Sequence, residues 1–272
     1  MTTTTRRTFL VASTAALAHA AAFARAAGAQ PAPASAEPVD PALIDDLVAA
    51  NRILADQGVV DGYGHVSVRH PAKPQRYLMS RSIAPETVTA ADIMEYDLDS
   101  TAVDARGRVS YLERFIHGEI YRARPDVKSV VHNHSPSVIP FGVSTVPLRP
   151  LYHMSAFLGG GVPVFDIKAA AGGPTDMLVR NPALGRALAA TLGPRPAALM
   201  RGHGCVVVGA SIQMAVFRSV YTEMNAKLQA QAMALGGPVT YLDDEEARLA
   251  AGSVGGTVVR PWDLWRKKAL GR

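Results

Sequence analysis

Segments with helical periodicity and segments with strand periodicity alternate along this chain, and this mixture constrains its fold more than any other feature. Apolar residues recur at helical spacing in residues 41–55, 111–124, 175–192 and 211–235. Strand-like patterns are found in residues 65–69, 76–80, 127–132 and 197–208. The gaps between strands are too irregular for a doubly wound repeat, and no Gly-rich nucleotide loop is present. The sequence therefore predicts an α/β fold in one domain.

The first 29 residues differ from the rest because they contain no acidic residue. Arg6 and Arg7 precede Phe9, an Ala-rich apolar run and small-residue cleavage motifs. This order predicts a secretory signal peptide, and the paired arginines resemble the twin-arginine type. We therefore expect a periplasmic protein, with a plain N-terminal tail as the alternative. The apolar run is too short for a good membrane span, so no membrane contact is expected after cleavage.

Composition limits the remaining chain, which divides into a linker at residues 30–40 and a domain at residues 41–272. The formal net charge is +5, and residues 1–29 supply three positive charges and no negative charge. A mature chain so close to neutral gives no argument for a nucleic-acid partner. The single cysteine, Cys205, excludes an internal disulfide and is expected to be a buried core residue near the site.

Two histidines separated by one residue, His132 and His134, end a β-branched run. Residues i and i+2 of a strand point to the same face, so both imidazoles are aimed at one place. His203 stands between two glycines and can complete a set of three, which is the arrangement of a catalytic zinc site with an open position. A His-x-His pair alone more often has a structural or incidental role. We expect one divalent metal per chain, with zinc first and manganese, cobalt or iron as alternatives.

The order of Glu113, His132-x-His134 and the Gly-flanked His203 resembles the class II aldolase/adducin family over about residues 42–235. The resemblance implies that the three histidines are metal ligands and that Glu113 shuttles a proton. It also implies a three-layer α/β/α sandwich around a largely antiparallel sheet, and a homotetramer with sites at subunit interfaces. Without the resemblance, Glu113 would be interpreted only as a favourable charge at a helix start.

The phosphate-binding motifs of the family's sugar-phosphate aldolases are missing. Residues 64–67 read Gly-His-Val-Ser where those enzymes have Gly-Asn-x-Ser, and residues 79–85 lack the glycine of a Ser-Gly turn. Tyr111 and Leu112 replace the small hydroxyl residues that precede the catalytic glutamate. Bulky side chains cannot present the close N–H groups that a phosphate requires. We therefore expect a small substrate without phosphate.

Candidate substrate-binding residues surround these altered motifs. They are His65 and Ser67 of the changed loop, with Arg69 and Arg81 nearby. A guanidinium suits a carboxylate, which favours a carboxylate-bearing substrate. Ordinary surface charge is the alternative role for the two arginines.

The family's aldolases place a tyrosine proton donor in the region of Tyr152 and His153, so either residue is a candidate acid. A buried core position is the alternative for both. The expected function is metal-dependent carbon–carbon cleavage, because some similar relatives decarboxylate dihydroxylated aromatic acids. An aldolase or epimerase acting on a small hydroxy-carbonyl compound is the alternative. A non-catalytic adducin-like binding module is a further one, although such a module should lose the histidines that this chain keeps.

Overall fold

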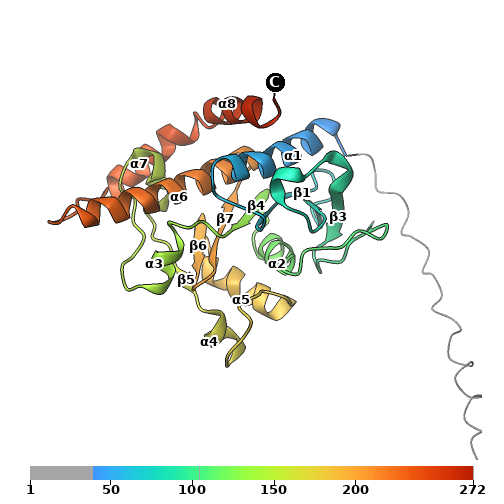
Figure 1. The fold of residues 1–272 in the computed structure, drawn as a ribbon, viewed down its shortest axis with the longest axis horizontal. Coiled ribbons are helices and arrows are strands. Elements are labelled where there is room, and N and C mark those ends of the chain that lie inside the picture. Colours follow the sequence, from blue (N-terminus) through green and yellow to red (C-terminus); the bar gives the residue numbers. More distant parts are fainter. Residues whose placement is uncertain (1–38, 104, 272) are drawn as a thin grey trace, which may run out of the picture. The chain divides into compact units, whose positions relative to one another are not determined.

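A computed structural model describes residues 39–103 and 105–271, and Figure 1 shows the arrangement of their helices and strands. The predicted signal peptide and most of the predicted linker lie outside the described residues. The described residues fall within one compact unit. None of their helices combines the length and the apolar character that crossing a membrane requires.

Seven strands form one sheet in the order β3-β2-β1-β4-β7-β6-β5. The strands are β1 His65–Arg69, β2 Arg76–Ser80, β3 Ile93–Asp97, β4 Ser129–Asn133, β5 Val164–Phe165, β6 Ala197–Met200 and β7 Gly204–Gly209. Neighbouring strands are antiparallel except for β5 and β6, which run parallel. The expectation of a largely antiparallel sheet is therefore corrected to a mixed sheet. Two helices separate β5 from β6 in the chain, and such a crossover returns the second strand in the same direction.

Helices connect and flank the strands. They are α1 Pro41–Asp56, α2 Phe115–Ala123, α3 Ile139–Val143, α4 Ile167–Ala171, α5 Pro182–Leu192, α6 Ile212–Ala234, α7 Asp244–Gly255 and α8 Val259–Ala269, with short 3-10 helices η1 Pro85–Thr87, η2 Ala90–Asp92 and η3 His153–Leu158. Asp40 caps α1 by accepting a hydrogen bond from the Ala42 N–H at 2.9 Å, as its position before Pro41 predicts. The longest helix is α6, and Ser211 caps it.

Two apolar clusters use opposite faces of the central strands. In β4, Val131 belongs to one cluster and Val130 to the other, and in β7 Val207 and Val208 divide in the same way. This alternation is the period-two pattern of a strand that is buried on both faces. The first cluster includes residues of α1, α6 and α8, which run alongside one another in Figure 1, and the second includes residues of α2 and α5. Helices therefore cover apolar residues on both faces of the sheet.

Candidate metal centre

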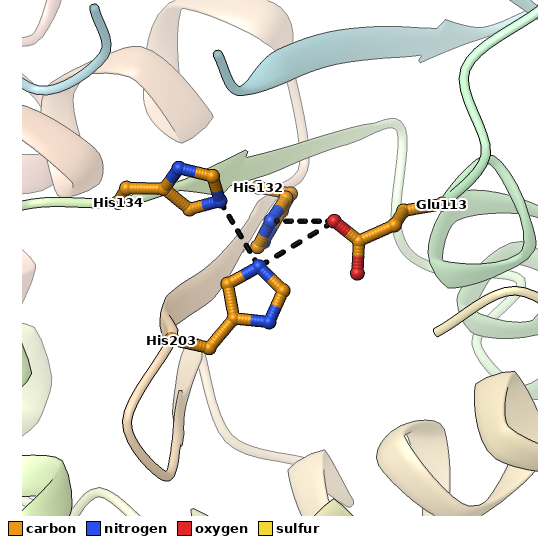
Figure 2. A group of neighbouring side chains, drawn as sticks. All are labelled: Glu113, His132, His134 and His203. Carbon is orange, nitrogen blue, oxygen red and sulfur yellow. Dashed lines mark hydrogen bonds and ion pairs between the residues drawn. The ribbon is translucent and has the colours of Figure 1, made fainter. Parts of the chain in front are cut away.

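Four side chains that lie far apart in the sequence meet beside the end of β4. Glu113, His132, His134 and His203 each offer one ligand atom, and these atoms all lie within 4.8 Å of one another. Figure 2 shows the three imidazole rings and the carboxylate directed toward a common centre. The fold thus brings together the residues for which the sequence predicts metal binding and proton transfer.

The ends of two neighbouring strands place the three histidines. His132 belongs to β4 and His134 follows one residue beyond its end, so the strand geometry sends both side chains to one face. His203 lies in the turn between β6 and β7, where Gly202 has a φ of +65°. A Cβ atom on Gly204 would overlap the backbone of β4. The two glycines therefore serve the tight turn and the close approach that carry His203 to the other two rings.

Glu113 reaches the cluster from the turn just before α2, rather than from the first turn of a helix as the sequence indicates. Its backbone oxygen accepts a hydrogen bond from the Ile116 N–H at 3.0 Å. The Val179 N–H donates to the Oε1 atom at 2.9 Å. The Oε2 atom lies 3.4 Å from Nε2 of both His132 and His203. One carboxylate oxygen is therefore fixed by the backbone, and the other faces the histidines.

Backbone carbonyls orient two of the imidazoles through their Nδ1 atoms. His132 Nδ1 lies 3.2 Å from the Cys205 oxygen, and His203 Nδ1 lies 2.9 Å from the Met177 oxygen. A proton on each Nδ1 leaves the Nε2 lone pair available to a metal. Nε2 of His132 is buried and has no hydrogen-bond partner in the described part of the chain. A buried nitrogen that makes no hydrogen bond and lies 3.4 Å from the Glu113 carboxylate fits a ligand atom that faces a metal ion.

The charges of the cluster suit cation binding. Burial, followed by the charges of His132 and His203, lowers the pKa of His134 to about 4. Burial alone would raise the pKa of Glu113, but His132 and His203 outweigh it and hold that pKa well below its usual range. Burial also opposes protonation of His203, yet its hydrogen bond to Glu113 and the carboxylate charge raise its pKa. His134 and Glu113 are thus held in the neutral and ionised forms that bind a divalent ion, whereas an ion that binds His203 would replace the proton that Glu113 favours on that ring.

The chemistry of these donors fits a divalent metal ion. Three imidazole nitrogens suit zinc and its neighbours in the first transition series, and a carboxylate oxygen can join them. Three protein ligands leave a coordination position for substrate, which is the difference between catalytic and structural zinc sites. The cluster therefore has the composition of a catalytic metal centre.

A pocket of about 290 Å³ opens beside the cluster, and Glu113 and His134 form part of its wall. Tyr111 and Leu112 line it as well. The Tyr111 hydroxyl donates to the Ile83 oxygen at 2.5 Å, and its aromatic ring is thereby held in the wall. Leu112 is 59% exposed although it lines the pocket, so an apolar side chain stands at the opening. These residues leave no small hydroxyl in the places where the sugar-phosphate motif would have it.

A chain of buried hydrogen bonds runs from the pocket into the fold. His65 lines the pocket, and its Nδ1 lies 2.6 Å from Nε2 of His117. Ser67 lies behind the pocket, with its Oγ 2.6 Å from Nδ1 of His117 and 2.8 Å from the Tyr121 hydroxyl. Burial and the charge of His132 lower the pKa of His117 to about 3.

Among the residues near the site, His117 is one that the sequence analysis does not identify. The available signal is its position four residues after Glu113, because the helix that the sequence predicts over residues 111–124 would place the two on one face.

The structure does not bring Arg69 and Arg81 to this pocket, contrary to the expectation that they bind substrate. Arg69 is buried and donates hydrogen bonds to four backbone oxygens, those of Pro74, Tyr121, Arg124 and Val127. Arg81 donates from Nε to Oδ1 of Asp92 at 2.6 Å. Both guanidinium groups therefore stabilise the fold rather than face the metal cluster.

Tyr152 and His153 lie at the start of η3, outside the pocket that contains Glu113. Their rings pack against each other, and the Tyr152 ring also contacts Tyr221. His153 lines a separate cavity of about 60 Å³. Within one chain neither residue reaches the pocket, so a catalytic role for either one stays a prediction that depends on a neighbouring subunit.

Comparison with known proteins shows which protein family and which sequence relatives this chain resembles. The family model described as the class II aldolase and adducin N-terminal domain matches residues 45–230. The decarboxylase tropJ of Talaromyces stipitatus is 38% identical over 241 residues, which cover 80% of this chain and 91% of that protein. A 3,4-dihydroxyphthalate decarboxylase of Terrabacter sp. is 34% identical over 212 residues, which cover 72% and 84% of the two chains.

A solved structure resembles the fold. The L-fuculose 1-phosphate aldolase of Glaciozyma antarctica aligns with a TM-score of 0.71 and 24% identity, over 87% of this chain and 95% of that chain. The sequence relatives named decarboxylase and aldolase identify this chain as an enzyme that acts on carbon–carbon bonds. By the extent of the family match and the identity to its relatives, the chain belongs to the class II aldolase and adducin family.

Proposed function

We propose that this chain is a divalent-metal-dependent decarboxylase of a dihydroxylated aromatic acid that carries no phosphate. The observation that carries the proposal is the cluster of Glu113 with three histidines, opening into a pocket walled by His65, Tyr111 and Leu112. An aromatic and apolar wall suits a flat ring better than a sugar phosphate. The names of the relatives tropJ and 3,4-dihydroxyphthalate decarboxylase support the same reaction.

The metal in this proposal is zinc, with manganese, cobalt or iron as alternatives, held by His132, His134 and His203. When bound, it supplies a Lewis acid for two adjacent substrate oxygens and lowers the energy of the charge left as CO₂ departs. The backbone carbonyls behind His132 and His203 keep their Nε2 atoms directed at it.

In this mechanism Glu113 accepts the proton of a substrate hydroxyl group and returns it to the ring carbon that CO₂ leaves, so that the products are a phenolate and CO₂. The Val179 N–H holds its Oε1, which leaves Oε2 as the atom that exchanges a proton with the substrate. That oxygen lies 3.4 Å from Nε2 of His132 and of His203, so a substrate held by a metal at these histidines would lie beside it. The same arrangement would serve a retro-aldol cleavage, in which Glu113 removes a hydroxyl proton. The relatives named L-fuculose phosphate aldolase, at 28% identity, keep that reaction as the alternative.

The test is to load purified protein with one metal at a time and to supply dihydroxylated aromatic acids, including 3,4-dihydroxyphthalate. Released CO₂ and the decarboxylated phenol are measured together. We expect about one metal ion per chain and CO₂ release that depends on it. Aldehyde release from hydroxy-carbonyl compounds without CO₂ from any aromatic acid would establish the alternative. A protein that binds no metal and cleaves neither aromatic acids nor hydroxy-carbonyl compounds would instead support the hypothesis of a non-catalytic binding module.

Three further features belong to the proposal. We infer that the helices on the two faces of the sheet complete a three-layer sandwich, and that the chain forms a homotetramer. A tetramer interface is one way for Tyr152 or His153 to reach a pocket, which is testable by light scattering beside the activity of their Ala variants. We also infer periplasmic export, for which Arg6→Lys with Arg7→Lys should leave the protein in the cytoplasm. Unchanged periplasmic accumulation of that variant would refute the twin-arginine route.

A further inference from the structure

We propose that His65 presents a neutral Nε2–H group to the pocket as the donor for the substrate carboxylate, and that Tyr121, Ser67 and His117 fix this tautomer. The identity of the acceptor rests on the proposed function. The tautomer itself follows from the hydrogen bonds and does not depend on that function.

The contact between His65 and His117 restricts where protons can lie. Two ring nitrogens 2.6 Å apart share one proton, so one ring donates and the other accepts. Both rings are buried, with 4% of His65 and 0% of His117 exposed, and burial disfavours a charged imidazole. With two neutral rings, the hydrogen bonds that join Tyr121, Ser67, His117 and His65 can run in two directions. Each group donates either to its neighbour on the pocket side or to its neighbour on the opposite side.

Tyr121 decides between these two arrangements. If the protons point away from the pocket, Ser67 donates to the Tyr121 oxygen, and the Tyr121 hydroxyl must find another acceptor. Tyr121 is 1% exposed, and its other partner among the described residues is the backbone N–H of Val130, which is itself a donor. That arrangement therefore leaves the buried hydroxyl proton of Tyr121 without an acceptor, which is unfavourable.

The opposite arrangement gives an acceptor to each donor of Tyr121, Ser67 and His117. The Tyr121 hydroxyl donates to Ser67, the Ser67 hydroxyl donates to Nδ1 of His117, and Nε2–H of His117 donates to Nδ1 of His65. The remaining proton of His65 then lies on Nε2. This nitrogen makes no hydrogen bond within the described part of the chain, and His65 lines the pocket. The Nε2–H group of His65, whose position is fixed by the buried network, can thus donate a hydrogen bond to a ligand in the pocket.

The position and charge of this donor suit a carboxylate that is to be lost. The His65 ring centre lies 5.1 Å from that of His132, so the donor stands beside the metal cluster. No arginine or lysine lines the pocket among the described residues. A guanidinium would stabilise the ionised carboxylate of the substrate more than the charge-dispersed transition state, and would slow CO₂ loss. A single neutral N–H can orient the carboxylate with less of that ground-state stabilisation.

The tautomer is tested by nitrogen NMR of zinc-loaded protein labelled with ¹⁵N at histidine. We expect His65 and His117 both to carry the proton on Nε2, with signals assigned from the His65→Gln and His117→Gln variants. Tyr121→Phe should relax this preference and give mixed tautomers. Tyr96→Phe is the matched control, because Tyr96 is a buried tyrosine bonded to Ser110 outside this network. Protons on Nδ1 of both rings in the wild type would overturn the inference.

The acceptor is tested by calorimetric binding of two probes to zinc-loaded protein: 2,3-dihydroxybenzoate and catechol, which lacks the carboxylate. We expect His65→Phe to weaken 2,3-dihydroxybenzoate binding roughly tenfold, the worth of one hydrogen bond to a charged group, and to leave catechol unchanged. His65→Gln should recover part of the loss, since its amide can donate. Equal loss for both probes, no loss for either, or no binding of either probe by the wild type would overturn the carboxylate assignment. Failure of the wild type to release CO₂ from any aromatic acid would instead reject the proposed function, while the tautomer result would stand.

Discussion

Glu113→Gln separates metal binding from proton transfer at this centre. Glutamine keeps the shape of the side chain and an oxygen that can accept the Val179 N–H hydrogen bond at 2.9 Å. It loses the oxygen that can exchange a proton 3.4 Å from His132 and His203. The three histidines are untouched, so the variant should retain its metal and its fold.

The expected loss of turnover is roughly 10²–10⁴-fold, the usual contribution of a positioned acid–base group. At about 1.4 kcal/mol for each tenfold change in rate, this raises the activation free energy by about 3–6 kcal/mol. The KM should change little, because the substitution retains the histidines and the pocket wall that would bind the substrate.

The assay uses one purified sample for two measurements. Its metal content is determined by elemental analysis, and its rate of CO₂ release is then measured. Glu95→Gln is the matched control, since Glu95 is also a buried carboxylate, 4% exposed, but pairs with Arg76 at 2.6 Å. That control should lower the unfolding temperature and leave turnover per folded molecule unchanged. Near-normal turnover of Glu113→Gln would refute its catalytic role, and loss of its metal would make Glu113 a ligand first.

Three other experiments, two with variants and one by chemical labelling, test the remaining predictions. His132→Ala should lose metal and activity together, because its Nε2 is one of the three imidazole nitrogens gathered in the cluster, and the metal content of the purified variant checks this. Burial raises the pKa of Cys205 to about 12, so iodoacetamide at pH 8 should label it only after unfolding, and rapid labelling of native protein would contradict this. Arg69→Met should destabilise the protein by about 2–4 kcal/mol in urea unfolding, because four backbone oxygens lose a charged donor, and should leave KM unchanged.

Sequence patterns predict this site best where its chemistry depends on local spacing. A strand places residues i and i+2 on one face, so the spacing of His132 and His134 is enough to predict that their side chains lie on the same side of the strand. The glycines beside His203 indicate a close backbone approach, which Gly204 makes against β4. The role of Glu113 needs the family resemblance, since a lone acid near a helix start has a common electrostatic explanation.

Other features depend on contacts that sequence patterns do not contain. Arg69 has the sequence context of an available cation, because no local pattern shows that carbonyls in the last turn of α2 and just after it face its guanidinium. The parallel pairing of β5 cannot be predicted because Val164–Phe165 is too short to give a periodic signal. His65 lies at the pocket, where a substrate-binding candidate is expected, but its partner His117 is 52 residues away in the chain.

A pocket wall without arginine or lysine, among the described residues, is the structural feature that best fits the proposed reaction. A sugar-phosphate aldolase gains from any group that binds the phosphate, because the phosphate stays charged throughout the reaction. A decarboxylase gains only from interactions that strengthen as the carboxylate charge moves into the ring and toward the metal. Here Arg69 and Arg81 are held by carbonyls and by Asp92, while Tyr111 and Leu112 line the pocket beside the cluster. The pocket thereby lacks a phosphate anchor, and in the proposed reaction it would stabilise the substrate carboxylate less than a guanidinium would.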